Sequence, residues 1–214
     1  MFWYLVIALL GAWLFARELK RPTPFGAARG SFEIGYLAVT GAMVLGGIGM
    51  ALAHLNFERT LSVHAREVSG NPAADVHCQS VLETMVDQLP MAVAHANPST
   101  GQIEFKATWC GHLDDYLDDP KNAKGETLWA LHVFTHEVMH IRGERNEQVT
   151  DCQAYQRNYM MAERLGVPVD IAERHAAEIY ANRSRHKNYF SDQCVRGGRL
   201  DEGLPYPPWP ARDD

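Results

Sequence analysis

An uncharged run near the start of the chain constrains the fold more than any other feature. No Asp, Glu, Lys or Arg occurs between Ile34 and Leu55, and a helix needs about 20 apolar residues to cross a bilayer. A second apolar run, Phe2 to Ala16, would be about 22 Å long as a helix, which is short for a span. Positive charges follow this run, whereas a cleaved signal peptide carries them before its apolar core. The sequence therefore predicts a membrane anchor of two transmembrane helices, at about residues 2–16 and 34–55.

The distribution of Lys and Arg orients this anchor. Only Arg59 and Arg66 follow the second run before Gly70, whereas the loop between the runs contains Arg17, Lys20, Arg21 and Arg29. Because cytoplasmic loops are enriched in such residues, we expect this loop in the cytoplasm and both termini outside. Small residues also recur every fourth position, at Ala8, Ala12 and Ala16 and at Ala38, Ala42 and Gly46. This spacing lets two helices approach closely, although Ala and Gly are common in transmembrane helices in any case.

Charge and cysteine content describe the remaining chain, residues 56–214. The net charge of -6 argues against a nucleic-acid-binding protein, which needs a basic face. All four cysteines lie in this part: Cys78, Cys110, Cys152 and Cys194. In an oxidising compartment an even number suggests two disulfides with three possible connectivities, and four buried free thiols are the alternative. We favour Cys110 with Cys152, which bracket the motif described next, and Cys78 with Cys194, which would tie the ends of the domain together.

The motif His136-Glu137-Val138-Met139-His140 carries the most specific chemistry in the chain. Two histidines four residues apart share one face of a helix and can bind one zinc ion. The glutamate beside the first histidine can act as general base toward water that the ion activates. His132 lies two turns, about 12 Å, from His140 along the helix axis, so we assign His132 to packing or to hydrogen bonding around the site.

A catalytic zinc site needs a third protein ligand, and three interpretations compete. Glu144 follows the second histidine by four, but ligands on three successive turns of a straight helix cannot meet at one ion. The pattern H-E-x-x-H-x-x-G-x-x-H requires a histidine where this chain has Asn146, a poor zinc ligand. In the third interpretation the chain turns at Gly143 and returns Glu147 to the ion, since glycine permits such a turn. Asp151, one turn later, would then accept the second ring N–H of a ligating histidine.

Local patterns predict a mainly helical domain with one small β-hairpin. The hairpin is expected between Met91 and Lys106, and its strand could be the edge along which an extended peptide binds or could serve the fold alone. Helices are expected at 56–70, 127–142, 144–165 and 170–182, and residues 76–89 form a short helix or a strand. The acidic stretch 114–120 is expected to be a solvated loop, and the tail from Arg196 to be extended.

The segment from His136 to Ala154 resembles the H-E-x-x-H … E-x-x-x-D-x-x-A pattern of gluzincin-type zinc metallopeptidases, known from integral-membrane peptidases of the CaaX-processing type. It is also similar to uncharacterised bacterial membrane-anchored proteins with an H-E-x-x-H-x-x-G-x-x-[ND]-E core. The resemblance implies His136, His140 and Glu147 as zinc ligands and Glu137 as catalytic base. The chain departs from the larger peptidases in the very short gap before Glu147.

The resemblance covers roughly residues 90–200, is strongest from 132 to 156, and implies a zincin-like fold. We therefore expect a mainly α domain of this kind over residues 56–214, behind the membrane anchor of residues 1–55. The expected activity is zinc-dependent hydrolysis of a peptide or protein substrate, with membrane lipid as a further partner and no nucleic acid. A hydrogen-bond donor to the oxyanion is expected from His112, Tyr155 or His175. The main alternative is a non-catalytic membrane protein that retains a metal or histidine cluster and acts in envelope assembly.

Overall fold

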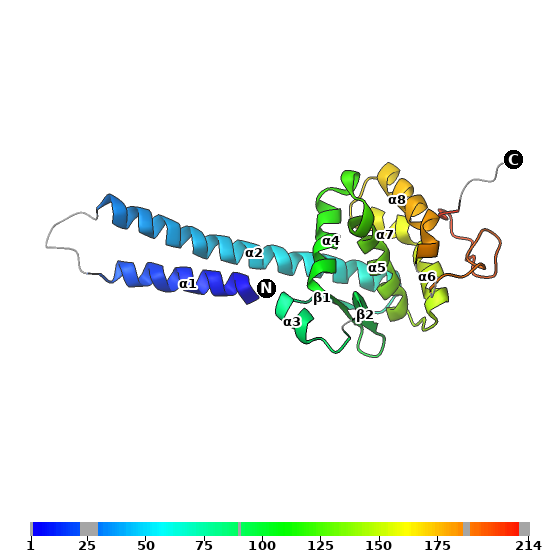
Figure 1. Cartoon of the computed structure of the whole chain (residues 1–214), viewed down its shortest axis with the longest axis horizontal. Coiled ribbons are helices and arrows are strands. Elements are labelled where there is room, and N and C mark those ends of the chain that lie inside the picture. The colour runs from blue at the N-terminus through cyan, green and yellow to red at the C-terminus, as the bar shows by residue number, and fades with distance from the viewer. Residues whose placement is uncertain (1, 22–29, 90, 186–188, 210–214) are drawn as a thin grey trace. The chain divides into compact units, whose positions relative to one another are not determined.

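The structure is a computed structural model that describes residues 2–21, 30–89, 91–185 and 189–209. The chain divides into two compact parts, residues 1–57 and 58–214. The first part consists of α1 (Phe2–Leu19) and the longer portion of α2 (Ser31–Ser69). The second part begins with the end of α2 and continues with β1 (Asp75–Cys78), α3 (Val81–Val86), β2 (Ala94–Asn97), β3 (Gln102–Phe105), α4 (Ala107–Asp118), α5 (Gly125–Ile141), α6 (Glu147–Tyr155), α7 (Asn158–Arg164) and α8 (Val169–Ala181), with 3₁₀ turns at Pro120–Asn122 and Arg183–Arg185 (Figure 1).

Helices α1 and α2 pack closely through small residues. A Cβ atom added at Gly11 would lie 3.0 Å from the carbonyl oxygen of Thr40, and one added at Gly47 would lie 2.6 Å from the carbonyl oxygen of Tyr4. A side chain is therefore excluded at Gly47, and one at Gly11 would require α2 to shift slightly. Of the predicted stripes, Ala8 is buried and lies against Gly47. The other members are exposed: Ala12, Ala16, Ala38, Ala42 and Gly46.

Among the described helices, α2 alone is long and apolar enough to cross a membrane. The first predicted span does form a helix, α1, which has 18 residues. Of the two predicted spans, therefore, one lies in a described helix with the length and apolarity that crossing requires. Helix α2 ends at Ser69, close to the predicted end at residue 70, because Gly70 takes a φ of 72° that an L-residue rarely adopts.

A three-stranded sheet lies in the second part, in the order β1-β3-β2. Strands β2 and β3 pair antiparallel, with Ala94 opposite Phe105 and Asn97 opposite Gln102, which confirms the predicted hairpin. Strand β1 pairs parallel with β3 on its other side, so the fold is mainly helical with a sheet one strand larger than expected. Strand β2 is an edge of this sheet and packs along α5.

Helix α5 is the core of the second part. Every residue from Leu128 to Met139 is buried, as expected for a helix surrounded by other elements. It packs against α4 and α6 as well as β2, and Figure 1 shows it between them. The predicted helices at 127–142 and 170–182 correspond to α5 and α8. The motif from His136 to His140 therefore lies on a helix that is buried along most of its length.

Two predicted elements differ from the structure. Most of the acidic stretch 114–120, predicted to be a loop, belongs to α4, because Cys110, Leu113 and Tyr116 recur every three residues and form a buried face. The helix predicted at 144–165 is divided into α6 and α7. At the break, Gln156 Nε2 donates to the carbonyl oxygen of Leu200 at 2.9 Å. The break between α6 and α7 is therefore a point of contact with the C-terminal segment.

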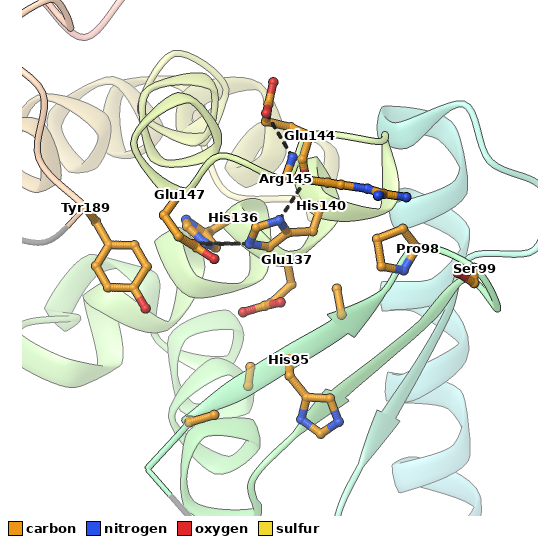
Figure 2. A pocket seen from close by; sticks show the side chains of 13 residues that line it. His95, Pro98, Ser99, His136, Glu137, His140, Glu144, Arg145, Glu147 and Tyr189 are labelled. Carbon is orange, nitrogen blue, oxygen red and sulfur yellow. Dashed lines mark hydrogen bonds and ion pairs between the residues drawn. The ribbon is translucent and has the colours of Figure 1, made fainter. Parts of the chain in front are cut away.

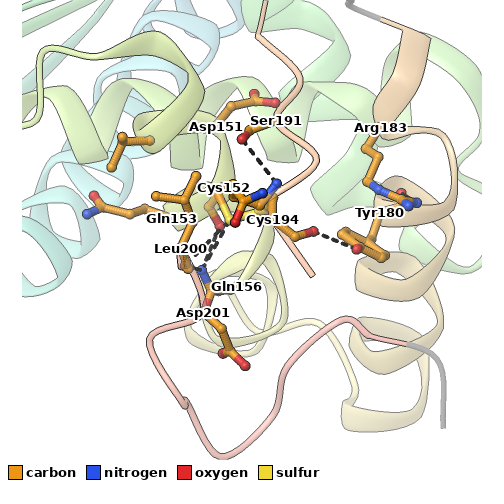
Figure 3. The surroundings of a disulfide bond; sticks show 12 residues. Asp151, Cys152, Gln153, Gln156, Tyr180, Arg183, Ser191, Cys194, Leu200 and Asp201 are labelled. Atoms are coloured by element: carbon orange, nitrogen blue, oxygen red, sulfur yellow. Dashed lines mark hydrogen bonds between the residues drawn. A yellow bond between two sulfur atoms is a disulfide. The ribbon is translucent and has the colours of Figure 1, made fainter. Parts of the chain in front are cut away.

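The four cysteines form two disulfides, as predicted, but with a different pairing from the favoured one. The bonds are Cys78–Cys110 and Cys152–Cys194, so the favoured pairs Cys110 with Cys152 and Cys78 with Cys194 are wrong. Cys78 lies opposite Phe105 in the sheet, and Cys110 follows Phe105 by five residues, so these two thiols meet locally. The second disulfide joins α6 to the C-terminal segment (Figure 3).

Candidate metal centre

The turn that follows α5 brings a carboxylate back toward the histidines. Gly143 adopts a φ of 113°, and its N–H donates to the carbonyl oxygen of His140 at 2.9 Å. The Glu144 carboxylate is occupied, because it accepts the backbone N–H groups of the next two residues at 2.8 and 2.9 Å. Asn146 caps α6 by accepting the N–H groups of residues 148 and 149. Helix α6 then begins with Glu147, so Glu144 and Asn146 serve the turn and Glu147 faces the site.

Three potential ligand atoms converge at the end of α5. Nε2 of His136 lies 3.1 Å from Nε2 of His140 and 3.1 Å from Oε2 of Glu147, and His140 Nε2 lies 3.3 Å from the same oxygen. In a tetrahedral zinc site with bonds of about 2.0–2.1 Å, ligand atoms lie about 3.3 Å apart. The three atoms are therefore close enough together to bind one metal ion of this size.

Hydrogen bonds on the far side of each ring fix which nitrogen faces this centre. Nδ1 of His140 lies 2.9 Å from the Glu144 carbonyl oxygen, which can only accept, so Nδ1 carries the proton. Nδ1 of His136 lies 3.3 Å from Oδ1 of Asp151 and donates to that carboxylate. In the neutral rings both Nε2 lone pairs then point at each other and at Glu147. This arrangement is repulsive unless a cation or a proton lies between them.

A second group lies deeper and shares His136. His132 Nε2 donates to Asp151 Oδ1 at 2.9 Å, and His132 Nδ1 lies 3.1 Å from Nδ2 of Asn158. The ring of His132 stacks on Tyr155, with 4.3 Å between centroids. The buried side chains of His132, His136 and Asp151 could also bind a metal ion. In the arrangement described, however, hydrogen bonds already occupy His132, which agrees with its assignment to packing and hydrogen bonding around the site.

The electrostatics of the centre favour positive charge. Burial lowers the pKa of His136, but hydrogen bonds to Asp151 and Glu147 and the charge of Glu137 outweigh it and raise this pKa to about 9. The pKa of Glu147 is lowered, first by its hydrogen bond to His136. Burial raises the pKa of Glu137, and the two histidines of the motif oppose this effect. A proton on His136 thus occupies the place that a cation would take.

A cleft of about 510 Å³ opens beside the three ligand atoms. Helix α5 forms one wall, and the edge strand β2 with His95 forms the opposite wall. Figure 2 shows the carboxylate of Glu137 between the two histidines and β2, with Tyr189 at the side. Substrate entering this cleft would meet the ligand atoms and Glu137 together.

The oxyanion donors considered from the sequence do not line this cleft. His112 lies 3.2 Å from Glu126, the Tyr155 ring is buried against His132, and His175 bonds to the hydroxyl of Tyr116. Tyr189 lines the cleft instead, with its ring 5.6 Å from that of His136.

Sequence reasoning missed Tyr189 because it lies far from the motif in the chain. The Cys152–Cys194 disulfide would have been the signal, since Cys194 follows Tyr189 by five residues and Cys152 follows Asp151 directly. Correct pairing of the cysteines would have placed the segment before Cys194 beside α6.

The predicted site residues therefore lie together: the two histidines of the motif, Glu137 and Glu147 line the cleft, and Asp151 supports His136 from behind. No protein-family model, curated protein or solved structure matches the chain. The function proposed below is therefore argued from the chemistry of these side chains.

Proposed function

We propose that the chain is a membrane-anchored, zinc-dependent peptidase whose second part lies outside the cytoplasm. The observation that carries this proposal is the convergence of two Nε2 lone pairs and one carboxylate oxygen at 3.1–3.3 Å. Both rings are held from behind, by Asp151 and by the Glu144 carbonyl group. Three protein ligands of this kind with an open side are typical of catalytic zinc, whereas structural zinc sites are closed and usually cysteine-rich. All described cysteines are in disulfides and so are not ligands.

The anchor places the domain at a membrane in this proposal. Helix α2 would cross the bilayer, and α1 would pack along it as a second membrane segment. The excess of Lys and Arg between the two apolar runs favours a cytoplasmic loop and an external domain. The two disulfides support the same orientation, because they persist in oxidising compartments.

His136, His140 and Glu147 would hold the ion, which would act as a Lewis acid that polarises the peptide carbonyl and acidifies water. Glu137 would accept the proton of the attacking water and donate it to the leaving amine. Strand β2 is an edge of the sheet formed by the described strands and lines the cleft. An extended peptide could bind along this edge through its backbone. Tyr189 would donate a hydrogen bond to the carbonyl oxygen as negative charge develops there.

Elemental analysis and one conservative variant test the proposal. The purified full chain should contain about one zinc per molecule. Glu137→Gln should keep the zinc and lose cleavage of an unfolded protein such as casein, because the amide cannot accept the proton. Glu147→Ala should weaken zinc binding far more than Glu144→Ala, because the Glu144 carboxylate accepts the backbone N–H groups of the turn. Absence of metal from the wild type, or full cleavage by Glu137→Gln, would end the peptidase proposal.

The second candidate is a non-catalytic metal-binding membrane protein that acts in envelope assembly. The buried group of His132, His136 and Asp151 favours it, because an ion there would be enclosed. This candidate predicts that His132→Asn removes the metal and that His140→Ala keeps it. The peptidase proposal predicts the reverse order of effects, so the two variants separate the candidates.

A further inference from the structure

Six large apolar side chains are exposed within a short stretch of the second part. This stretch, named the α3 patch, comprises Val81, Leu82, Met85, Val86, Leu89 and Met91. Met85, Val86 and Met91 are the most exposed, at 76, 79 and 93%. Other exposed large apolar residues described in the second part are scattered: Val63, Val169, Tyr189, Val195 and Tyr206. Single exposed apolar residues are common, whereas a cluster of this kind marks an interaction surface.

Polar contacts, rather than apolar packing, hold this stretch in place. None of the residues of α3 is buried. Ser80 and Glu83 form a capping box, with each side chain bonded to the backbone N–H of the other. The Asp87 carboxylate accepts from Gln79 Nε2 at 2.7 Å and lies 3.0 Å from Lys106 Nζ. The acidic groups are thus bound within the domain, and the apolar side chains are directed outward.

Chain connectivity limits how far the α3 patch can lie from the end of the apolar run of α2. Leu55, the last residue of that run, precedes Glu58 by three positions, which is at most about 11 Å along the chain. Glu58 Oε1 accepts the N–H of Cys78 at 2.7 Å and lies 3.1 Å from Nδ1 of His77. Nε2 of the same histidine lies 3.5 Å from Glu83 on α3. Two side-chain contacts within the second part therefore link Glu58, three residues after the apolar run, to α3.

We propose that the α3 patch is a lipid-docking surface that inserts into the interfacial layer of the membrane crossed by α2. This inference rests on the membrane anchor in the proposed function. Amphipathic segments of this kind bury their apolar face about 5–10 Å into the boundary between headgroups and acyl chains. A bilayer is the occupant favoured by connectivity, because the anchor holds the patch within its reach in every molecule. Met91 and the next residue, Ala92, also line the space beside the metal centre, so docking would place the cleft near the membrane surface.

Spin labels on the full chain test this surface directly. Met85→Cys carries the label in the patch, and Val169→Cys, at an exposed apolar residue of α8, is the matched control. Both proteins are labelled with the native disulfides intact and reconstituted into vesicles of phosphatidylcholine and phosphatidylglycerol. The ratio of oxygen to nickel-chelate accessibility should be several-fold higher at position 85 than at 169. Equal ratios would overturn the inference, as would a label at 85 that is immobilised and shielded from both reagents, because a second copy or another protein would then cover the patch.

A second measurement separates this inference from the peptidase proposal. Met85→Ser combined with Val86→Ser changes neither the ligands nor the lining of the cleft, so zinc content and cleavage of a soluble peptide should equal those of the wild type. If the wild-type protein shows no zinc-dependent cleavage, the peptidase proposal is refuted, whereas the docking inference is unaffected. Extraction of the wild-type chain from vesicles by alkaline carbonate would show that the anchor is absent and would overturn the docking inference.

Discussion

Asp151→Asn is the perturbation that tests the metal centre most closely. The substitution keeps the size and shape of the side chain and removes its charge. Oδ1 of Asp151 accepts from Nε2 of His132 at 2.9 Å and from Nδ1 of His136 at 3.3 Å. Both bonds are charge-assisted in a buried setting, and the second fixes the tautomer in which His136 Nε2 would face the proposed ion.

The expected magnitude follows from the role of Asp151 behind a ligand. Loss of such a partner typically weakens metal binding by about 10–100-fold, which is about 1.4–2.8 kcal/mol of binding free energy. The amide oxygen of Asn can still accept a hydrogen bond, so Asp151→Asn should lie near the lower value. Asp151→Ala leaves two buried N–H groups without an acceptor and should lie near the upper value.

Competition with a chromophoric chelator near neutral pH measures zinc affinity in the full chain. Glu144→Gln is the matched control, because it also neutralises a carboxylate near the site but keeps an acceptor for the turn. Wild-type affinity in Asp151→Ala would refute the role of Asp151 in orienting His136. Complete loss of zinc in Asp151→Asn together with retention in His140→Ala would instead place the ion in the deeper group.

Three further substitutions test the turn, the tether and the cleft. Gly143→Ala should lower the free energy of unfolding, measured by denaturant titration, by about 1–3 kcal/mol, because a φ of 113° strains an L-residue. The control Gly111→Ala lies in the middle of α4 with open space around the new Cβ, and it should raise the free energy of unfolding. Cys152→Ser breaks the bond to Cys194 across 42 residues and should lower the free energy of unfolding by about 4 kcal/mol in the chain-entropy description; an unchanged melting temperature would contradict this. Tyr189→Phe should lower kcat by about 100-fold or more, with KM and zinc content unchanged, if its hydroxyl stabilises the oxyanion; unchanged kcat would remove that role.

Local spacing was sufficient to predict the arrangement of the motif and its neighbours. The positions of His136 and His140 follow from helical periodicity alone. The return of Glu147 required only that Gly143 break the helix, and the structure places the turn at that residue. Asp151 lies one turn further on the same helix, so its approach to His136 is also a consequence of local geometry.

Long-range contacts were not accessible in the same way. Tyr189 and His95 reach the cleft from the C-terminal segment and from β2, and no periodic pattern links either residue to α5. The disulfide pairing failed for the same reason, because it depends on the parallel addition of β1 to β3, which brings Cys78 to the start of α4. The acidic composition of residues 114–120 also led to the wrong prediction of a loop. A helix forms there because apolar residues at intervals of three are buried, while the aspartates remain exposed.

Because Asp151 and Cys152 are neighbours on α6, the proposed metal centre lies next to a disulfide whose formation depends on the redox conditions of the compartment. Asp151 orients His136, and the next residue is bonded to Cys194 in the segment that carries Tyr189. The side chain of Gln156, one turn later, holds the same segment by bonding to Leu200 (Figure 3). A reducing environment would remove the covalent tie but leave the histidines and Glu147 in place. We therefore expect the Cys152–Cys194 disulfide to position Tyr189 in the wall of the cleft and to contribute little to metal binding. A reduced chain should retain zinc while its catalytic turnover falls.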